Sequence, residues 1–148
     1  MNSRDILLVA VNCKERDKEL CKEAIHYAKT MHMSVTFIHV IEYIPCYDIF
    51  PFDNKKVKSL LEEEIATSLT VYEHEMTENG LRVNPPVIAE GSIADVICEK
   101  AEEVNAMAIM VNADESFLFD AWIESADKKI ARLANRNVII VKAKVLAN

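Results

Sequence analysis

The chain has 148 residues, 51% hydrophobic and 28% charged, which favours one compact domain over residues 1–148 with a sizeable core. Its formal net charge of -7, with no basic cluster longer than two lysines, disfavours nucleic acid as a partner. No apolar run approaches the roughly 18 residues that cross a bilayer and no cleavable leader is recognised, so we expect a cytoplasmic protein that does not associate with a membrane.

The sequence predicts five short strands, most of them almost continuously apolar. Such runs are typical of strands that are buried on both faces of a parallel sheet, because a half-solvated strand would alternate. In chain order the strands are Ile6–Val11, Val35–Val40, Pro86–Ala89, Ala106–Val111 and Val138–Val141.

Four segments between these strands repeat their apolar residues with a helical period. They run over Leu20–Met31, Val57–Met76, Ser92–Val104 and Trp122–Ala134. The Ser92 hydroxyl is expected to cap the third helix. Strict alternation of strand and helix predicts an α/β fold, a doubly wound, mainly parallel five-stranded sheet with helices on both faces.

The segment Glu42–Asn54 has two prolines, four aromatic residues and no clear period. At this aromatic density we expect an ordered loop that packs its own side chains. A lid or a partner surface is the alternative.

Several kinds of chemistry are excluded by what the sequence lacks. Its two glycines, Gly80 and Gly91, allow neither a G-x-G-x-x-G turn nor a G-x-x-x-x-G-K-[ST] loop. The four cysteines and four histidines form no C-x-x-C, H-E-x-x-H or comparable ligand spacing, so we expect neither a metal site nor a resident cofactor. No nucleophile has a base and an orienting group at a recognisable spacing, so we expect no catalytic residue and no enzyme.

In an open α/β sheet, ligands bind beyond the carboxyl ends of the strands. The residues there are Asn12–Lys14, Ile41–Tyr43 and Asn112–Glu115. The simplest interpretation of Asn12 and Asn112 is that their amides form local turn hydrogen bonds.

Other polar residues also have structural interpretations. His39 lies in an apolar strand and is expected to be a satisfied core histidine, and Glu62–Glu64 to be a solvated helix face. Ser125 fits a helix cap better than a phosphate donor. Cys13 follows the first strand near a helix N-terminus, where a thiolate is favoured, so a redox or modification role stays open.

The chain resembles the universal stress protein family from end to end. The residues that carry this resemblance are ILLVAVN, VTFIHV, VIAEGSIADVICEKAEEVNAMAIMVN and the tail IESADKKIARLANRNVIIVK. The resemblance implies a universal stress protein-like fold of the adenine nucleotide alpha hydrolase-like kind.

The nucleotide-binding branch of that family holds the phosphates of ATP with a G-x-x-G loop after the fourth strand and a Gly-Ser at the next helix. Matching the flanks puts Asn112 and Glu115 at the first two glycines and Glu124-Ser125 at the Gly-Ser. Cβ atoms then occupy positions where backbone must approach phosphate, and carboxylates replace anion-binding N–H groups. Each carboxylate within about 4 Å costs a phosphate charge about 4 kcal/mol at an effective dielectric near 20. The further candidates to face this crevice are Asp114, Asp120, Glu124 and Asp127.

The resemblance therefore implies a regulatory or adaptor protein of the stress response that does not bind ATP and acts through an unidentified protein partner. The alternative is a nucleotide-binding switch or weak ATPase of the same family. A third possibility, an electron-transfer or synthetase-related domain, is disfavoured because no cofactor motif is present. The residues expected at the degenerate nucleotide crevice are Asn12, Val40, Asn112, Glu115 and Ser125.

The last strand also predicts an assembly. Members of the family commonly dimerise by pairing this strand across a two-fold axis, and its apolar half makes a bare sheet edge unfavourable. We expect a homodimer through Val138, Ile140 and Lys142. The alternative is a monomer whose lysines protect the edge.

Overall fold

The computed structural model describes residues 5–42, 54–113 and 125–142. Within these ranges the chain alternates strictly between strand and helix. The elements are β1 (Ile6–Ala10), α1 (Asp17–Met31), β2 (Ser34–Ile41), α2 (Asn54–Glu78), β3 (Val87–Glu90), α3 (Ile93–Glu103), β4 (Ala108–Asn112), α4 (Ala126–Leu133) and β5 (Asn137–Val141).

The five strands form one sheet in the order β3-β2-β1-β4-β5, and every neighbouring pair is parallel. The predicted doubly wound α/β fold is therefore confirmed. The chain adds β2 and β3 on one side of β1, and then β4 and β5 on the other. The strand order reverses between β1 and β4, which is where ligand crevices form in this class of fold.

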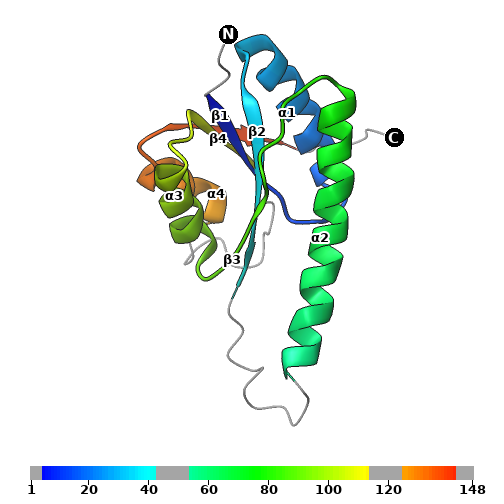
Figure 1. Ribbon diagram of the computed structural model, residues 1–148. Coiled ribbons are helices and arrows are strands. Elements are labelled where there is room, and N and C mark those ends of the chain that lie inside the picture. Colours follow the sequence, from blue (N-terminus) through cyan, green and yellow to red (C-terminus); the bar gives the residue numbers. More distant parts are fainter. Residues whose placement is uncertain (1–4, 43–53, 114–124, 143–148) are drawn as a thin grey trace, which may run out of the picture.

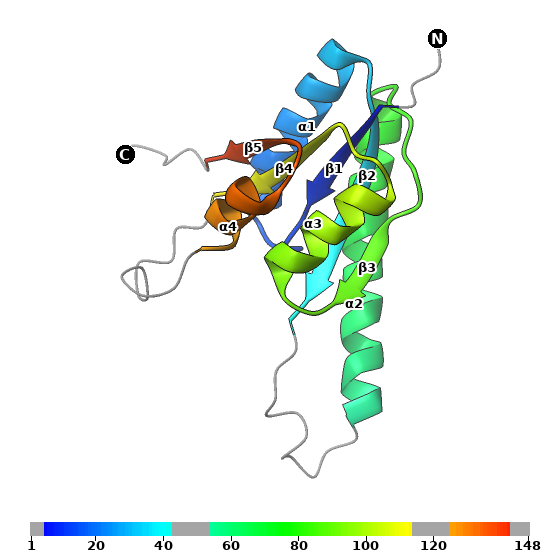
Figure 2. The ribbon, with the colours of Figure 1, turned by 90° about the vertical axis from the view of Figure 1, so that its left-hand side faces the viewer.

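Two hydrophobic cores lie on opposite faces of the sheet (Figure 1). Successive strand residues point to opposite faces, so Leu7 and Val9 pack with α1 and α2, whereas Leu8 packs with α3 and α4. Figure 2 looks onto the α3 and α4 side. This division explains why the strands are apolar at nearly every position.

The element ends differ from the predicted ones where periodicity carries no signal. β3 starts at Val87, the first residue of its pairing with β2, because Pro86 has no N–H for a ladder. α2 starts at Asn54, before the predicted Val57. α4 begins at Ala126, and the predicted start of that helix at Trp122 lies outside the described residues, as does most of the loop predicted over Glu42–Asn54.

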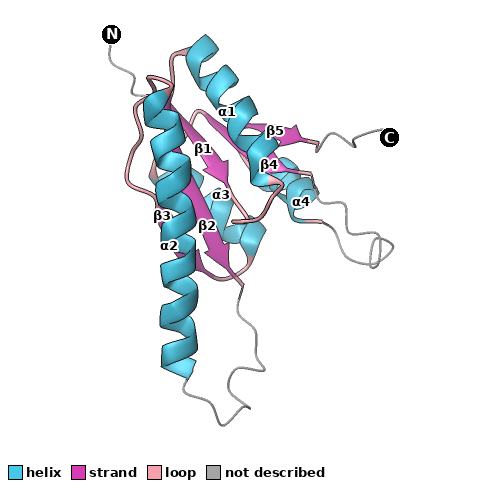
Figure 3. Cartoon of the chain, turned by 90° about the vertical axis from the view of Figure 1, so that its right-hand side faces the viewer, coloured by secondary structure: helices cyan, strands magenta, loops and turns pink. Residues whose placement is uncertain are grey.

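Helix α2 extends beyond the sheet. Its first turns pass the carboxyl ends of the strands, while its later turns cover the sheet face beside α1 (Figures 1 and 3). The later part buries Ile65, Leu69 and Met76. The earlier part thus forms a wall next to the edge of the sheet where a ligand would be expected.

The turn from β3 to α3 depends on Gly91. Its φ is +139°, a backbone conformation that L side chains rarely adopt, and a Cβ built there would lie 2.9 Å from Cγ2 of Val96. Ser92 is the N-cap residue of α3, as predicted, but its side chain makes no capping hydrogen bond. The expectation of a hydroxyl cap was wrong; the Ser92 carbonyl instead accepts the Val96 N–H at 2.9 Å.

None of the helices in the described ranges is long and apolar enough to cross a membrane.

Candidate functional site

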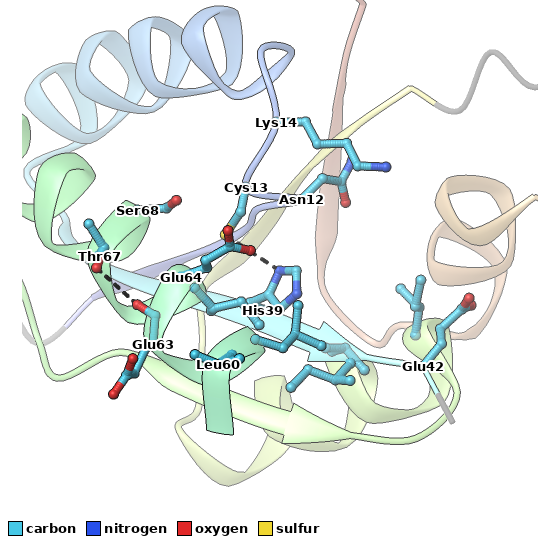
Figure 4. A pocket seen from close by; sticks show the side chains of 15 residues that line it. Asn12, Cys13, Lys14, His39, Glu42, Leu60, Glu63, Glu64, Thr67 and Ser68 are labelled. Carbon is cyan, nitrogen blue, oxygen red and sulfur yellow. Dashed lines mark hydrogen bonds between the residues drawn. The ribbon is translucent and has the colours of Figure 1, made fainter. Parts of the chain in front are cut away.

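A cleft of about 1090 Å³ opens beside the carboxyl ends of β1 and β2, against the first half of α2. Figure 4 shows side chains from the loop after β1, from β2 and from α2 facing this space. Its described lining residues are Asn12, Cys13, Lys14, His39, Val40, Ile41, Glu42, Leu60, Leu61, Glu63, Glu64, Ile65, Thr67, Ser68 and Ile93.

The Asp17 carboxylate holds together the elements around this cleft. The side chain is fully buried in the first turn of α1. Its Oδ1 accepts the Asn12 N–H at 3.2 Å and the Asn112 amide at 3.1 Å. Its Oδ2 accepts the Cys13 N–H at 2.7 Å and the Tyr72 hydroxyl at 2.9 Å. Four donors from β4, α2 and the loop after β1 thus converge on one carboxylate at the strand-order reversal.

The backbone of the loop after β1 is shaped by this carboxylate. Cys13 has a φ of 60°, in the left-handed region that non-glycine residues seldom adopt. That conformation lets the consecutive N–H groups of Asn12 and Cys13 both bond to Asp17. As a result, these N–H groups point into the protein and are not offered to a ligand.

The Cys13 thiol keeps its proton. Burial raises the pKa of Cys13 from 9.0, the neighbouring Asp17 charge raises it further, and a hydrogen bond with Ser68 lowers it only in part, leaving a pKa of about 11. The expectation of a favoured thiolate at this position was therefore wrong. Burial and the Asp17 charge outweigh the effect of the nearby helix N-terminus.

His39 is half-buried on β2 and faces the cleft. Its Nδ1 lies 2.8 Å from the carbonyl oxygen of Val11 and 3.7 Å from the Cys13 sulfur. Because a carbonyl oxygen can only accept, Nδ1 donates the hydrogen bond in this contact. His39 is thus anchored as a core histidine should be, but it also lines the cleft, which the sequence did not indicate.

Carboxylates form most of the charged rim of the cleft. Glu42 follows β2, and Glu63 and Glu64 project from α2. Lys14 is the one lysine or arginine among the described lining residues. The predicted solvated face Glu62–Glu64 is indeed exposed. However, two of its three carboxylates border the cleft, because α2 extends past the sheet.

The five residues predicted at the crevice do not all lie in the same place in the structure. Asn12 and Val40 line the cleft. Asn112 ends β4, and its amide donates to Asp17 on α1, which is a structural contact but not the local turn bond that was expected. The turn interpretation of Asn12 stays a prediction, because its bond to Asp17 comes from the backbone N–H and not from the side-chain amide. Glu115 lies outside the described residues.

Ser125 is the N-cap residue of α4, but its side chain makes no capping hydrogen bond. Its Oγ and the Oδ1 of Asp127 are buried without a hydrogen-bond partner. Neither residue is among those that line the cleft. Of the other acidic residues expected to face the crevice, Asp114, Asp120 and Glu124 lie outside the described residues.

Asp17 is the main residue that the sequence analysis missed. A signal was present, because Asp17 continues the buried stripe of Leu20, Cys21 and Ala24 at helical spacing. A carboxylate on the buried face of a first helical turn needs several donors. Within the described ranges, no group of three or more His, Cys, Asp or Glu side chains is arranged to hold a metal ion.

Comparisons with known proteins agree with this architecture. A family model described as "Universal stress protein family" matches residues 3–142. Among solved structures, a protein of the universal stress protein family from Burkholderia pseudomallei superposes with a TM-score of 0.75 at 19% identity, covering 97% of this chain and 99% of that one. No curated protein matches the chain.

Two further solved structures were determined with nucleotides. A universal stress protein in complex with cAMP has a TM-score of 0.70 at 16% identity, covering 95% of this chain and 98% of that one. The universal stress protein from Archaeoglobus fulgidus in complex with dAMP has a TM-score of 0.65 at 18% identity, covering 92% of this chain and 96% of that one.

Proposed function

The chain belongs to the universal stress protein family, and we propose that it is a regulatory or adaptor member that does not hold ATP. One observation carries this proposal: the buried Asp17 carboxylate takes up the N–H groups of Asn12 and Cys13 and the amide of Asn112. Phosphate binding needs donors that point outward at the strand-order reversal. Among the described residues at this reversal, the N–H groups of Asn12 and Cys13 and the Asn112 amide point inward to Asp17.

The charge around the site supports the same proposal. Asp17 places one negative charge behind the loop, and Glu42, Glu63 and Glu64 place three more around the cleft. A unit charge about 4 Å from another of the same sign costs about 4 kcal/mol at an effective dielectric near 20. A triphosphate at this edge of the sheet would meet several such carboxylates and one described lysine, Lys14.

A role in catalysis is not part of the proposal. Cys13 and His39 are neighbours in the cleft, and a Cys–His pair can form a nucleophile when the histidine takes the thiol proton. In this pair Nδ1 is engaged with the Val11 carbonyl, and the Cys13 thiol has a pKa of about 11. These features support a binding or regulatory role.

A nucleotide-binding switch is the second candidate, and one observation favours it. Ser125 Oγ is buried at the N-terminus of α4 without a partner. An unsatisfied hydroxyl at a helix N-terminus can donate to a phosphate oxygen. The solved relatives with cAMP and dAMP show that this fold can hold nucleotides in other chains.

Titration with Mg-ATP, followed by calorimetry and by thermal unfolding, separates the two candidates. Ligand binding to the native state raises the unfolding temperature by mass action. We expect no binding heat and no shift at millimolar Mg-ATP for the natural chain. A shift of several degrees would establish the switch and contradict the regulatory proposal.

Two variants test a second contribution to the loss of ATP binding, namely the residues that the resemblance places at the glycine positions of the phosphate loop. The triple variant Asn112→Gly, Glu115→Gly, Glu124→Gly removes the Cβ atoms and the charges together, and we expect it to gain measurable affinity for Mg-ATP. The double variant Glu115→Gln, Glu124→Gln removes the charges but keeps the Cβ atoms, and we expect a smaller gain. If the triple variant folds and still ignores Mg-ATP, the lost glycines are not what prevents binding.

A further inference from the structure

We propose that the cleft between β2 and α2 binds a small organic cation, an ammonium group attached to an apolar or aromatic body. This inference rests on the proposed function, in which the chain does not hold ATP and the cleft is open to another ligand. It goes further by assigning the chemical class of the ligand.

The cleft has the size and the surface for such a molecule. Its volume of about 1090 Å³ is slightly above the usual range of about 300–1,000 Å³ for small-molecule sites. Aliphatic side chains from three elements give it an apolar lining, and they are Val40, Ile41, Leu60, Leu61, Ile65 and Ile93. Val40 and Ile65 are buried, whereas Leu60 is 56% exposed at the mouth of the cleft. An apolar body can therefore bury its surface against several elements at once.

The polar atoms around this lining are mostly acceptors. The carboxylates of Glu42, Glu63 and Glu64 can only accept hydrogen bonds when ionised. A ligand that matches these atoms has to bring N–H donors.

Some of the donors at the cleft are already in use. The Thr67 hydroxyl donates to the Glu63 carbonyl at 2.9 Å, and the Cys13 N–H donates to Asp17. Asn12 and Lys14 lie together on the loop after β1, whereas Glu63 and Glu64 come from α2 (Figure 4). Polar donors and carboxylates thus reach the cleft from different elements.

Charge favours a cation over an anion or a neutral ligand. Three carboxylates and one ammonium group border the cleft among the described residues. Each carboxylate alone would remain solvated, and a surface ion pair contributes little. A ligand whose body fills the apolar lining displaces that water, so its ammonium group is held where the dielectric screening is weaker.

The test uses three probes that share the indole ring and differ in charge: tryptamine as the cation, indole-3-ethanol as the neutral analogue and indole-3-propionate as the anion. Calorimetry at low ionic strength and neutral pH is expected to show binding in that order of affinity, with no heat for the anion. Adenosine serves as a neutral nucleoside for comparison.

Variants on α2 locate the charge that matters. Glu63→Gln, Glu64→Gln together should weaken tryptamine binding about tenfold or more, which corresponds to about 1.4 kcal/mol. Glu62→Gln is the matched control, because Glu62 is an exposed neighbour on the same helix that does not line the cleft. It should change the affinity by less than about twofold.

Several results would overturn the proposal. These are no tryptamine binding at millimolar concentration, equal affinity for the cation and the anion, tighter binding of adenosine than of tryptamine, and equal weakening by Glu62→Gln.

A parallel Mg-ATP titration keeps the two proposals distinguishable. If neither ATP nor tryptamine binds, this inference fails and the proposed function stands; if ATP binds, the proposed function fails by itself.

Discussion

Asp17 lies close to the strand-order reversal, where open α/β sheets form ligand crevices, and here its carboxylate bonds to other parts of the chain. Its carboxylate accepts four hydrogen bonds, at 2.7 to 3.2 Å, from the loop after β1, from β4 and from α2. A fully buried carboxylate is costly unless donors surround it. The four donors meet that requirement, and each of them would be left unsatisfied if the carboxylate were removed.

Asp17→Ala is therefore expected to lower the free energy of unfolding by about 2–4 kcal/mol, because buried donors lose their acceptor. Chemical denaturation followed by circular dichroism measures the loss. Glu15→Ala, two residues away and exposed, is the control and should change stability by less than about 0.5 kcal/mol. Equal effects of the two variants would show that the convergence on Asp17 does not stabilise the protein.

Cys13 gives stability a pH dependence at the alkaline end. Burial and the Asp17 charge raise the pKa of its thiol from 9.0 to about 11 in the folded chain. Between these values the unfolded thiol loses its proton while the folded one keeps it, so stability is lost as pH rises from about 9 to about 11. Burial raises the pKa of Cys21 to about 12, which acts in the same direction.

Denaturation measured from pH 8 to pH 11 should accordingly show a falling free energy of unfolding, and Cys13→Ala should make that fall shallower. A stability that stays level over this range in the natural chain would mean that the Cys13 thiol ionises as readily in the folded state as in the unfolded one.

At the scale of elements, the apolar pattern of the sequence predicted the strands of the sheet correctly but predicted the helix ends less well. All five strands were predicted, because strands buried on both faces are apolar at nearly every position. The start of α2 was missed, since its first turns extend beyond the sheet and periodicity reports only the packed face. The side-chain cap at Ser92 was predicted from residue type, but the cap depends on a rotamer that the sequence does not specify.

The two glycines allow a matched test of the turn from β3 to α3. Both have a positive φ, +79° at Gly80 and +139° at Gly91, but only at Gly91 would a Cβ meet another side chain, 2.9 Å away. Gly91→Ala should therefore destabilise the fold by about 2–3 kcal/mol, and Gly80→Ala by about 1 kcal/mol. Thermal unfolding of both variants measures these two losses of stability. If Gly80→Ala lowers the stability as much as Gly91→Ala does, the close contact at Gly91 is not the cause.

For the whole molecule, the sequence correctly indicated a site at the carboxyl ends of β1 and β2, but it did not indicate most of the residues that line or support this site. Asn12 and Val40 line the cleft as predicted. The roles of Asp17, His39 and the Glu63–Glu64 wall follow from how α1 and α2 pack beside the strands. That packing is tertiary and leaves no fixed spacing in the chain, so sequence patterns alone could not reveal it.

Among the described residues, no strand pairs with the outer edges of the sheet, and we propose a homodimer through one of these edges. β3 and β5 are the outer strands, and each has one exposed isoleucine, Ile88 at 39% and Ile140 at 38%. An apolar edge strand is unfavourable when bare. The expected interface is the β5 edge, with Val138, Ile140 and Lys142.

Light scattering coupled to size-exclusion chromatography should find a dimer for the natural chain and for Ile88→Arg, but a monomer for Ile140→Arg. The two substitutions place the same charge on equally exposed residues, so they differ only in which edge strand carries that charge. A natural chain that is monomeric, or a dimer broken by Ile88→Arg alone, would contradict the β5 interface.

We propose that this chain does not hold ATP, because described donors at the strand-order reversal point inward to Asp17 and carboxylates border the neighbouring cleft. The most direct measurement is the adenine nucleotide content of the freshly purified protein, released by denaturation and quantified by chromatography. The account predicts only traces, far below one nucleotide per chain. A stoichiometric amount of adenine nucleotide would contradict it.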